Sequence, residues 1–285
     1  MEYWGQILLA SAIQMIAAIG MFLQIRSGQL NVGQAVFVGV GGYSSGLLAM
    51  DVGLPIPLAM ALAIVFGFVF GAIFSALTLR LHHWFFAVTT LALSIAAHGS
   101  IGKVAFLGGP LGISGVPLLV SPVPILIMLV LAIATSLMIE RSSLGLAVRA
   151  MGDDQLLSQM FGTGVRRLRV FMFAVGAAMG AGAGALNAHR FGVYQPSDMG
   201  VEASLMLFVF VIVGGKRSLW GPILGTLLLY VLPEAIDIDP RARMIVFGAL
   251  LLLCGVAMPE GIVGLIQAGL RRLRHVRSMP VQNAT

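Results

Sequence analysis

Residue types that could perform catalysis or bind a metal are few in this chain, and their spacing matches none of the common patterns. His82, His83 and His98 lack the spacing and the acidic neighbours of a metal site. Lys216 follows a glycine, but Phe210 stands where the first glycine of a phosphate-binding loop is required. No serine, histidine and aspartate stand in an arrangement typical of a nucleophile and its base. We therefore expect no catalytic residue, no metal and no cofactor on this chain.

Ionisable residues inside apolar segments would favour a carrier driven by an ion gradient, and this chain has few of them. Such residues are costly in the hydrocarbon core and mark proton or ion relays. Glu202 and Glu234 are the main candidates, and both lie near the ends of apolar segments rather than at their centres. If the protein performs uphill work, this pattern favours a partner protein as the source of energy.

A group of uncharged polar residues interrupts otherwise apolar segments and could line a path for a small polar molecule. Their amides and hydroxyls could hydrogen-bond a zwitterion without forming a strong fixed site. The same groups could instead cap helices or join neighbouring helices, and both interpretations stay open. The group consists of Gln29, Asn31, Gln34, Tyr43, Thr89, Thr90 and Ser94. A break in the helix near Gln29–Gln34 would favour the path, because irregular backbone in a membrane lines cavities or is buried in protein.

The segment 140–169 is polar and charged, and it lies between two long apolar stretches. Asp153 or Asp154 can cap the N-terminus of a short helix, and Gly162 can end it. An apolar stripe that includes Leu157 and Phe161 would occupy one face of this helix. Such a helix fits a groove on a soluble partner or lies on the lipid surface, and both remain open. The candidate docking residues are Arg149, Asp153, Asp154, Leu157, Phe161 and Gly162.

Composition indicates an integral membrane protein. The chain has 285 residues, of which 59% are hydrophobic and 10% charged, and its mean hydropathy is +1.00. Soluble domains carry about 25% charged residues, so a soluble enzyme is excluded. The net charge of +6 does not indicate nucleic-acid binding, because the basic residues lie between apolar segments. Cys254 is the single cysteine, which excludes an internal disulfide and a thiolate metal site.

The elements that must position these residues are membrane-spanning helices of about 20 residues. We predict an all-α, polytopic membrane helix bundle of about nine (8–10) transmembrane helices, with the first span retained rather than cleaved as a signal peptide. Residues 1–270 form a single transmembrane domain that includes the loop 140–169, and residues 271–285 form a basic to polar tail. The predicted spans are 5–24, 34–50, 56–79, 83–100, 122–140, 170–189, 200–215, 221–238 and 243–258.

The distribution of basic residues predicts the orientation. If the loop 140–169 is cytoplasmic, thirteen of the 17 Lys and Arg residues fall on the cytoplasmic side. This bias places the N-terminus outside and the tail inside. Glycines at four-residue spacing, such as Gly176, Gly180 and Gly184, predict closely packed helices, since small residues let helix backbones approach each other in lipid.

The loop 140–169 and the span after it resemble the central cytoplasmic loop of ABC-transporter permeases of the branched-chain amino-acid (LIV) family. Positions that fit the pattern of this family are Gly145, Arg149, Ala150, Asp153 and Gly162. Further similar blocks are SGQLNVGQA (27–35) with GGY (41–43), LRL (79–81) with FFAVTTL (85–91), GGP (108–110) with GI (112–113), SLWGP (218–222) with LG (224–225), and Pro259 with Gly261. The residue patterns of these blocks resemble the M-type subunit of the family more than the H-type subunit. Departures from the family pattern are Leu157-Ser158 in place of Ala-Ala, Gln155 and Gln159 in place of acids, and the residues His82-His83-Trp84 and Lys216-Arg217.

The resemblance implies a multi-pass permease of the bacterial cytoplasmic (inner) membrane that imports branched-chain or related amino acids by alternating access. Its implied partners are an H-type permease subunit, two ABC ATPase subunits that carry ATP and Mg, and an external substrate-binding protein. The docking residues of the loop would contact an ATPase. Alternatives are an importer of urea, short amides or aromatic acids, a sugar permease of similar architecture, and an ion-gradient-driven secondary carrier.

Overall fold

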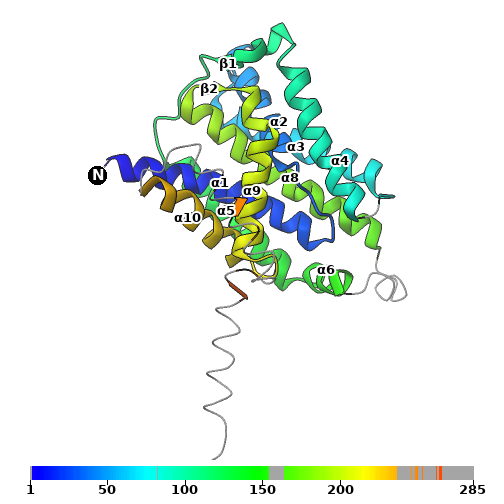
Figure 1. Cartoon of the computed structure of the whole chain (residues 1–285). Coiled ribbons are helices and arrows are strands. Elements are labelled where there is room, and N and C mark those ends of the chain that lie inside the picture. The colour runs from blue at the N-terminus through cyan, green and yellow to red at the C-terminus, as the bar shows by residue number, and fades with distance from the viewer. Residues whose placement is uncertain are drawn as a thin grey trace, which may run out of the picture.

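This computed structural model describes residues 2–81, 83–153 and 164–235, together with residues 245, 248, 249, 252, 261, 263 and 264. Within these residues the fold is an all-α bundle (Figure 1). Its helices are α1 (Glu2–Arg26), α2 (Gln34–Met50), α3 (Ile56–Thr78), α4 (His83–Ile101), α5 (Val123–Arg141), α6 (Ser143–Asp153), α8 (Val165–Phe191), α9 (Val201–Gly214) and α10 (Trp220–Ala235). Short 3-10 turns and strands join them: η1 (Ala105–Leu107), η2 (Gly109–Leu111), β1 (Ile113–Ser114), β2 (Val193–Tyr194) and η3 (Pro196–Met199).

The predicted all-α membrane bundle is confirmed, with two differences in detail. Eight of the predicted spans coincide with helices, and the ninth, 243–258, falls mostly outside the described residues. Five helices are long and apolar enough to cross a membrane, whereas α2, α9 and α10 have only 17, 14 and 16 residues. Helix α6 was not predicted, because the polarity of its segment resembles that of a loop.

Helix α8 lies at the centre of the bundle and packs against α1, α2 and α3. The predicted glycine face makes these contacts. A side-chain carbon at Gly176 would overlap the backbone of Gly20, and one at Gly184 would overlap the backbone of Val38. Backbones that approach this closely leave no room for side chains larger than hydrogen, which explains the glycines physically. The four-residue spacing therefore predicted the central helix interface correctly.

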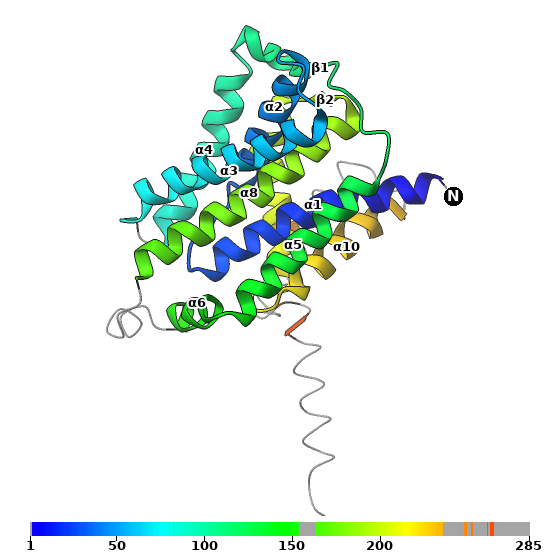
Figure 2. The same ribbon diagram turned by 180° about the vertical axis from the view of Figure 1, so that it is seen from behind.

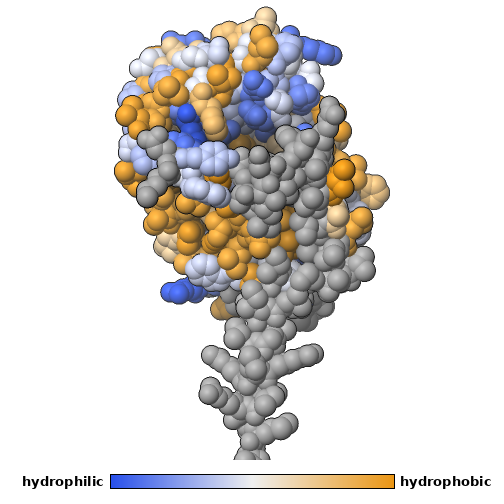
Figure 3. Space-filling view, turned by 60° about the vertical axis from the view of Figure 1, so that its left-hand side comes forward, coloured by the Kyte–Doolittle hydropathy of each residue, from blue (hydrophilic) through white to orange (hydrophobic). Residues whose placement is uncertain are grey.

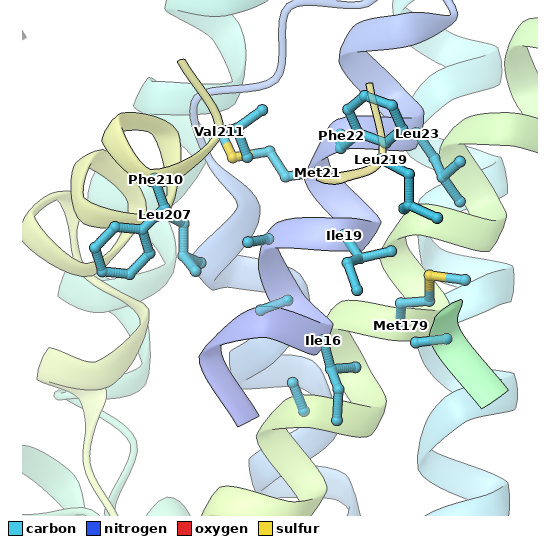
Figure 4. Packing of buried hydrophobic residues seen from close by; sticks show 14 of the residues in the cluster. Ile16, Ile19, Met21, Phe22, Leu23, Met179, Leu207, Phe210, Val211 and Leu219 are labelled. Carbon is cyan, nitrogen blue, oxygen red and sulfur yellow. The ribbon is translucent and has the colours of Figure 1, made fainter. Parts of the chain in front are cut away.

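Beside α8, the core is apolar and centred on α1. Figure 4 shows Ile16 and Ile19 of α1 between Met179 of α8 on one side and Leu207 and Phe210 of α9 on the other. Phe22 and Phe210 are fully buried. Since the lipid interior is as apolar as these side chains, close van der Waals packing rather than water exclusion holds this core together in a membrane.

The peripheral helices expose apolar side chains. Helices α4 and α5 bury only 17% of their membrane-length segments, against 72% for α1 and α8. Trp84 and Phe85 of α4 and Val130 of α5 are strongly exposed. Figure 3 shows hydrophobic residues over much of one face of the molecule, with hydrophilic residues gathered toward its upper end. Such faces suit lipid or another membrane-embedded protein.

The two ends of the bundle differ. Helix α6 lies at one end, and the strands β1 and β2 lie at the other (Figures 1 and 2). Arg26 donates a hydrogen bond to the backbone carbonyl of Arg217, and α1 also contacts α6, so these basic residues share the end of α6. Arg190 bonds to Gln6 at the N-terminal end of α1. The positive-inside pattern of the sequence places Arg26 and Arg217 on the cytoplasmic side and Arg190 on the outer side, and the structure separates them in the same way.

Candidate functional site

The chain between α1 and α2, residues 27–33, is an irregular segment buried inside the bundle. The predicted break in the helix near Gln29–Gln34 is therefore confirmed. Gly28 has a φ of +80°, a conformation that glycine adopts without strain and that lets the chain turn after α1. Ser27 and Asn31 are fully buried, and Gln29 is 4% exposed. Buried irregular backbone needs internal hydrogen-bond partners, and polar side chains supply them.

Three side-chain amides form a chain of hydrogen bonds along this segment. Nδ2 of Asn31 donates to Oε1 of Gln34 at 2.9 Å and to Oε1 of Gln24 at 2.5 Å. The Nε2 groups of Gln24 and Gln34 in turn donate to the carbonyls of Phe173 and Gly176 on α8, at 3.2 and 3.0 Å. The break between α1 and α2 is thus tied to the central helix at two successive turns.

Hydroxyl groups tie the same segment to α4 and α9. The backbone N–H of Val32 donates to Oγ1 of Thr90 at 3.0 Å, and the N–H of Ala35 donates to Oγ of Ser204 at 3.2 Å. The Oγ atoms of Ser94 and Ser204 lie 3.1 Å apart. These bonds satisfy free backbone N–H groups at the start of α2, which has no side-chain cap of its own.

The structure brings together most of the residues predicted to line a path and separates two of them. Gln29, which donates to Ser75 at 2.8 Å, joins the cluster described above. The cluster, here called the inner cluster, is Gln24, Gln29, Asn31, Gln34, Ser75, Thr90, Ser94 and Ser204. Thr89 lies outside it, partly exposed, and donates back to the carbonyl of Phe85. Tyr43 belongs to a different region. The predicted role of these residues in transport stays a prediction.

Sequence reasoning missed Gln24, Ser75 and Ser204, although the same signal could have found them. Each is a polar residue near the end or inside of an apolar segment. In the present conformation the members of the inner cluster bond mainly to one another and to backbone groups. These hydrogen bonds therefore join the helices to one another. A polar molecule could pass between the helices only if some of these bonds broke.

A second polar region lies where α2 meets β2 and η3. The rings of Tyr43 and Tyr194 meet edge to face, with centroids 5.3 Å apart. Asp198 accepts a hydrogen bond from the N–H of Gln195 at 3.1 Å. Burial raises the pKa of the Asp198 carboxyl, and this hydrogen bond opposes the shift. Burial also raises the pKa of Tyr194 well above its usual value, and the charge of Asp198 adds to the effect. We call Tyr43, Tyr194 and Asp198 the outer cluster.

A buried histidine holds the loop that precedes α5 against α8 close to this region. Nδ1 of His189 lies 2.8 Å from the carbonyl oxygen of Pro117, and Nε2 lies 2.9 Å from Oγ of Ser45. A carbonyl can only accept, so Nδ1 carries a proton and donates to Pro117, while the hydroxyl of Ser45 can either donate to Nε2 or accept from it. His189 therefore has a positioning role. Within the described residues, no group of three or more His, Cys, Asp or Glu could hold a metal ion.

The predicted docking residues lie largely outside what the structure describes. Arg149 and Asp153 belong to α6, Asp153 as its last residue, but their side chains are not among those described. Asp154, Leu157, Phe161 and Gly162 lie outside the described residues. The structure adds that α6 packs against α5, α1 and α8 while Leu144 and Leu146 stay exposed, 42% and 66%. The docking role of this segment stays a prediction.

Comparison with known proteins decides the family. The family described as "Branched-chain amino acid transport system / permease component" matches residues 3–255. The chain belongs to this permease family. No solved structure matches the chain. The match runs from the first turn of α1 to beyond α10, so the fold and the motif blocks point to the same family.

The matches to individual relatives extend over only part of each relative's length. The permease protein LivH of the high-affinity branched-chain amino acid transport system of Salmonella typhimurium is 33% identical over 135 residues, 46% of this chain and 43% of LivH. LivM of the corresponding system of Escherichia coli K12 is 27% identical over 144 residues, 50% of this chain and 34% of LivM. The ribose import permease protein RbsC of Haemophilus influenzae is 28% identical over 129 residues, 42% of this chain and 40% of RbsC. The chain thus spans less than half the length of the curated relatives it matches, and both LivH and LivM are among them.

Proposed function

We propose that this protein is a membrane-spanning subunit of a bacterial ABC importer for branched-chain or related amino acids. The observation that carries the proposal is the family match over residues 3–255. The names of the LivH and LivM relatives support the substrate class. The apolar outer helices support a place in the bacterial inner membrane, beside lipid and a second permease subunit.

In this proposal two partner ATPases supply the energy, and the permease itself performs no chemistry. ATP and Mg bind to the ATPases, and the ATPases bind to the segment that begins with α6. Since a ligand shifts a conformational equilibrium only by binding its states differently, the ATPases must contact this segment differently with and without nucleotide. An external substrate-binding protein would deliver the amino acid to the opposite end of the bundle.

Helix α6 is well placed for this role. It follows α5 directly and contacts α1 and α8, whose other contacts reach the inner cluster. A displacement of α6 can therefore reach Gln24 of α1 and the carbonyls of α8 through packed helices. We infer that opening of the inner cluster is the step of the cycle that lets the substrate pass.

Two measurements test the proposal. The tagged protein is extracted gently from its native host, and the proteins that co-purify are identified by mass spectrometry. We expect two P-loop ATPases and a second hydrophobic permease subunit. Uptake of labelled leucine, isoleucine and valine by the host, with and without the gene for this chain, then tests the substrate. Ribose serves as the competing substrate, because RbsC is also a relative.

The proposal fails if the protein purifies alone even after cross-linking. In that case a gradient-driven carrier becomes the better hypothesis, and collapse of the proton or sodium gradient should abolish uptake. Recovery of the ATPases together with uptake of urea, an aromatic acid or ribose instead of leucine would keep the importer and refute the amino-acid substrate.

A further inference from the structure

The outer cluster contains buried polar groups that the protein itself does not satisfy. Tyr194 is fully buried and Tyr43 is 5% exposed, and the rings lie against each other. Neither phenolic hydroxyl has a hydrogen-bond partner among the described residues. Native proteins leave few buried polar groups unpaired, so two unpaired hydroxyls on adjacent rings need an explanation.

The third member, Asp198, has no cationic partner within the part of the chain that the structure describes. It is partly buried, and its hydrogen bond within the described part of the chain comes from the N–H of Gln195. No lysine or arginine among the described residues pairs with it. Asp198 follows Tyr194 by four residues, and η3, to which Asp198 belongs, packs against α2, the helix that carries Tyr43. A partly buried carboxylate that has no cationic partner is stabilised when a positive group binds to it.

The tyrosine positions are held firmly by the backbone around them. The ring of Tyr194 lies on Gly42 of α2, where any side-chain carbon would come within 2.6 Å of the ring. The strand pair β1–β2 fixes the backbone of Tyr194 opposite Ile113. These contacts fix where the ring of Tyr194 lies against α2.

We propose that Tyr43, Tyr194 and Asp198 bind the ammonium group of the transported molecule at the end of the bundle opposite α6. A primary ammonium carries three N–H donors and a positive charge. It can donate to the carboxylate and to both phenolic oxygens, and it is attracted to the faces of the two rings. A sugar offers no charge, and the carboxylate of an aromatic acid would be repelled.

This inference rests on the proposed function and narrows its substrate class to molecules with an ammonium group. The test is initial uptake of labelled L-leucine, below saturation, by cells that carry the complete transporter. The variants are Tyr43→Phe and Tyr194→Phe, which keep both rings and remove only the hydroxyls. Tyr3→Phe, at a residue that is 59% exposed at the start of α1, is the matched control.

We expect each of the two inner variants to lower leucine uptake about tenfold, as is typical when one hydrogen bond to a charged group is lost. The unfolding temperature of the purified protein should stay the same or rise, because a buried unpaired hydroxyl is removed. Asp198→Asn should lower uptake at least as much, since it removes the charge and keeps an oxygen for the N–H of Gln195. Tyr3→Phe should change neither quantity.

Two results would overturn the inference. One is leucine uptake within twofold of wild type in Tyr43→Phe, Tyr194→Phe and Asp198→Asn together. The other is a lower unfolding temperature that accompanies the loss of uptake, because the hydroxyls would then have partners in the protein. A wild-type transporter that imports no leucine, isoleucine or valine would instead refute the proposed function, so the two failures are distinguishable.

Discussion

Replacement of Gly33 by alanine should push the junction between α1 and α2 away from α4 and destabilise the protein. Gly33 precedes α2 and lies against the backbone of α4. An added Cβ would be 2.7 Å from the carbonyl carbon of Thr90 and 3.0 Å from Oγ of Ser94, and it would overlap the Thr90 carbonyl oxygen. Ordinary carbon contacts are about 3.5–4.0 Å, so α2 and α4 must separate by roughly 1 Å.

The energy of this change follows from two effects. Overpacking of a close-packed interior costs about 1–3 kcal/mol. A separation of this size also stretches the bond from Val32 to Thr90, now 3.0 Å, beyond useful length, which removes about 1 kcal/mol. The total is a destabilisation of about 2–4 kcal/mol, which corresponds to a fall in the unfolding temperature of roughly 5–10 °C.

The assay is thermal unfolding of the purified protein in a mild detergent, with leucine uptake measured in parallel. Gly99→Ala is the matched control, since Gly99 lies in α4 with nothing within 4 Å of the added carbon. That control should be neutral or stabilise the protein by up to about 1 kcal/mol, because alanine favours helix. If Gly33→Ala unfolds at the wild-type temperature and imports leucine normally, the segment 27–33 is not locked against α4 and the reasoning is wrong.

Three further predictions concern the inner cluster, the central interface and the outer cluster. Gln34→Leu should destabilise the protein by about 1–3 kcal/mol, because Asn31 and a carbonyl of α8 lose their partner; normal uptake by a folded Gln34→Leu protein would count against this segment lining the path. Gly184→Ala should lower the unfolding temperature more than Gly182→Ala, since the first overlaps backbone and the second only the end of a flexible methionine; equal effects would contradict the close packing. The pKa of Asp198 is raised in the folded protein, so its stabilising contribution is complete below about pH 3.8 and is lost as pH rises through the folded value. Asp198→Asn should therefore unfold at a higher temperature than wild type at pH 7, and this difference should shrink on acidification. A difference in unfolding temperature that stays the same between pH 4 and pH 7 would contradict the raised pKa.

Apolar length and small-residue spacing gave most of the fold from the sequence, because both depend on local composition. A membrane helix needs an apolar segment of a certain length, and eight of the predicted spans coincide with described helices, five of which are long and apolar enough to cross a membrane. This criterion did not identify helix α6, since a helix of 11 residues with polar positions is neither long nor uniformly apolar. The β1–β2 strand pair was also not predicted, because it joins residues that are far apart in the chain.

The candidate site was harder to predict, because the direction of a side chain depends on the rotation of its helix. Thr89 and Thr90 are neighbours in the same motif, yet Thr90 enters the inner cluster and Thr89 faces outward. Tyr43 and Tyr194 are 151 positions apart, and no local pattern pairs them. The residue types were therefore recognisable as polar groups in apolar helices, while their partners required the three-dimensional arrangement.

The two clusters differ in a way that separates stability from function. Inner-cluster groups are satisfied by the protein, so replacements there should lower stability, as predicted for Gln34→Leu. The two phenolic hydroxyls of the outer cluster have no hydrogen-bond partner among the described residues, so their removal should hold or raise stability while uptake falls. Proteins keep unfavourable groups where a ligand, rather than the fold, requires them. If the variants of both clusters lowered stability alike, the outer cluster would be an ordinary part of the fold, and the ammonium site would have no support.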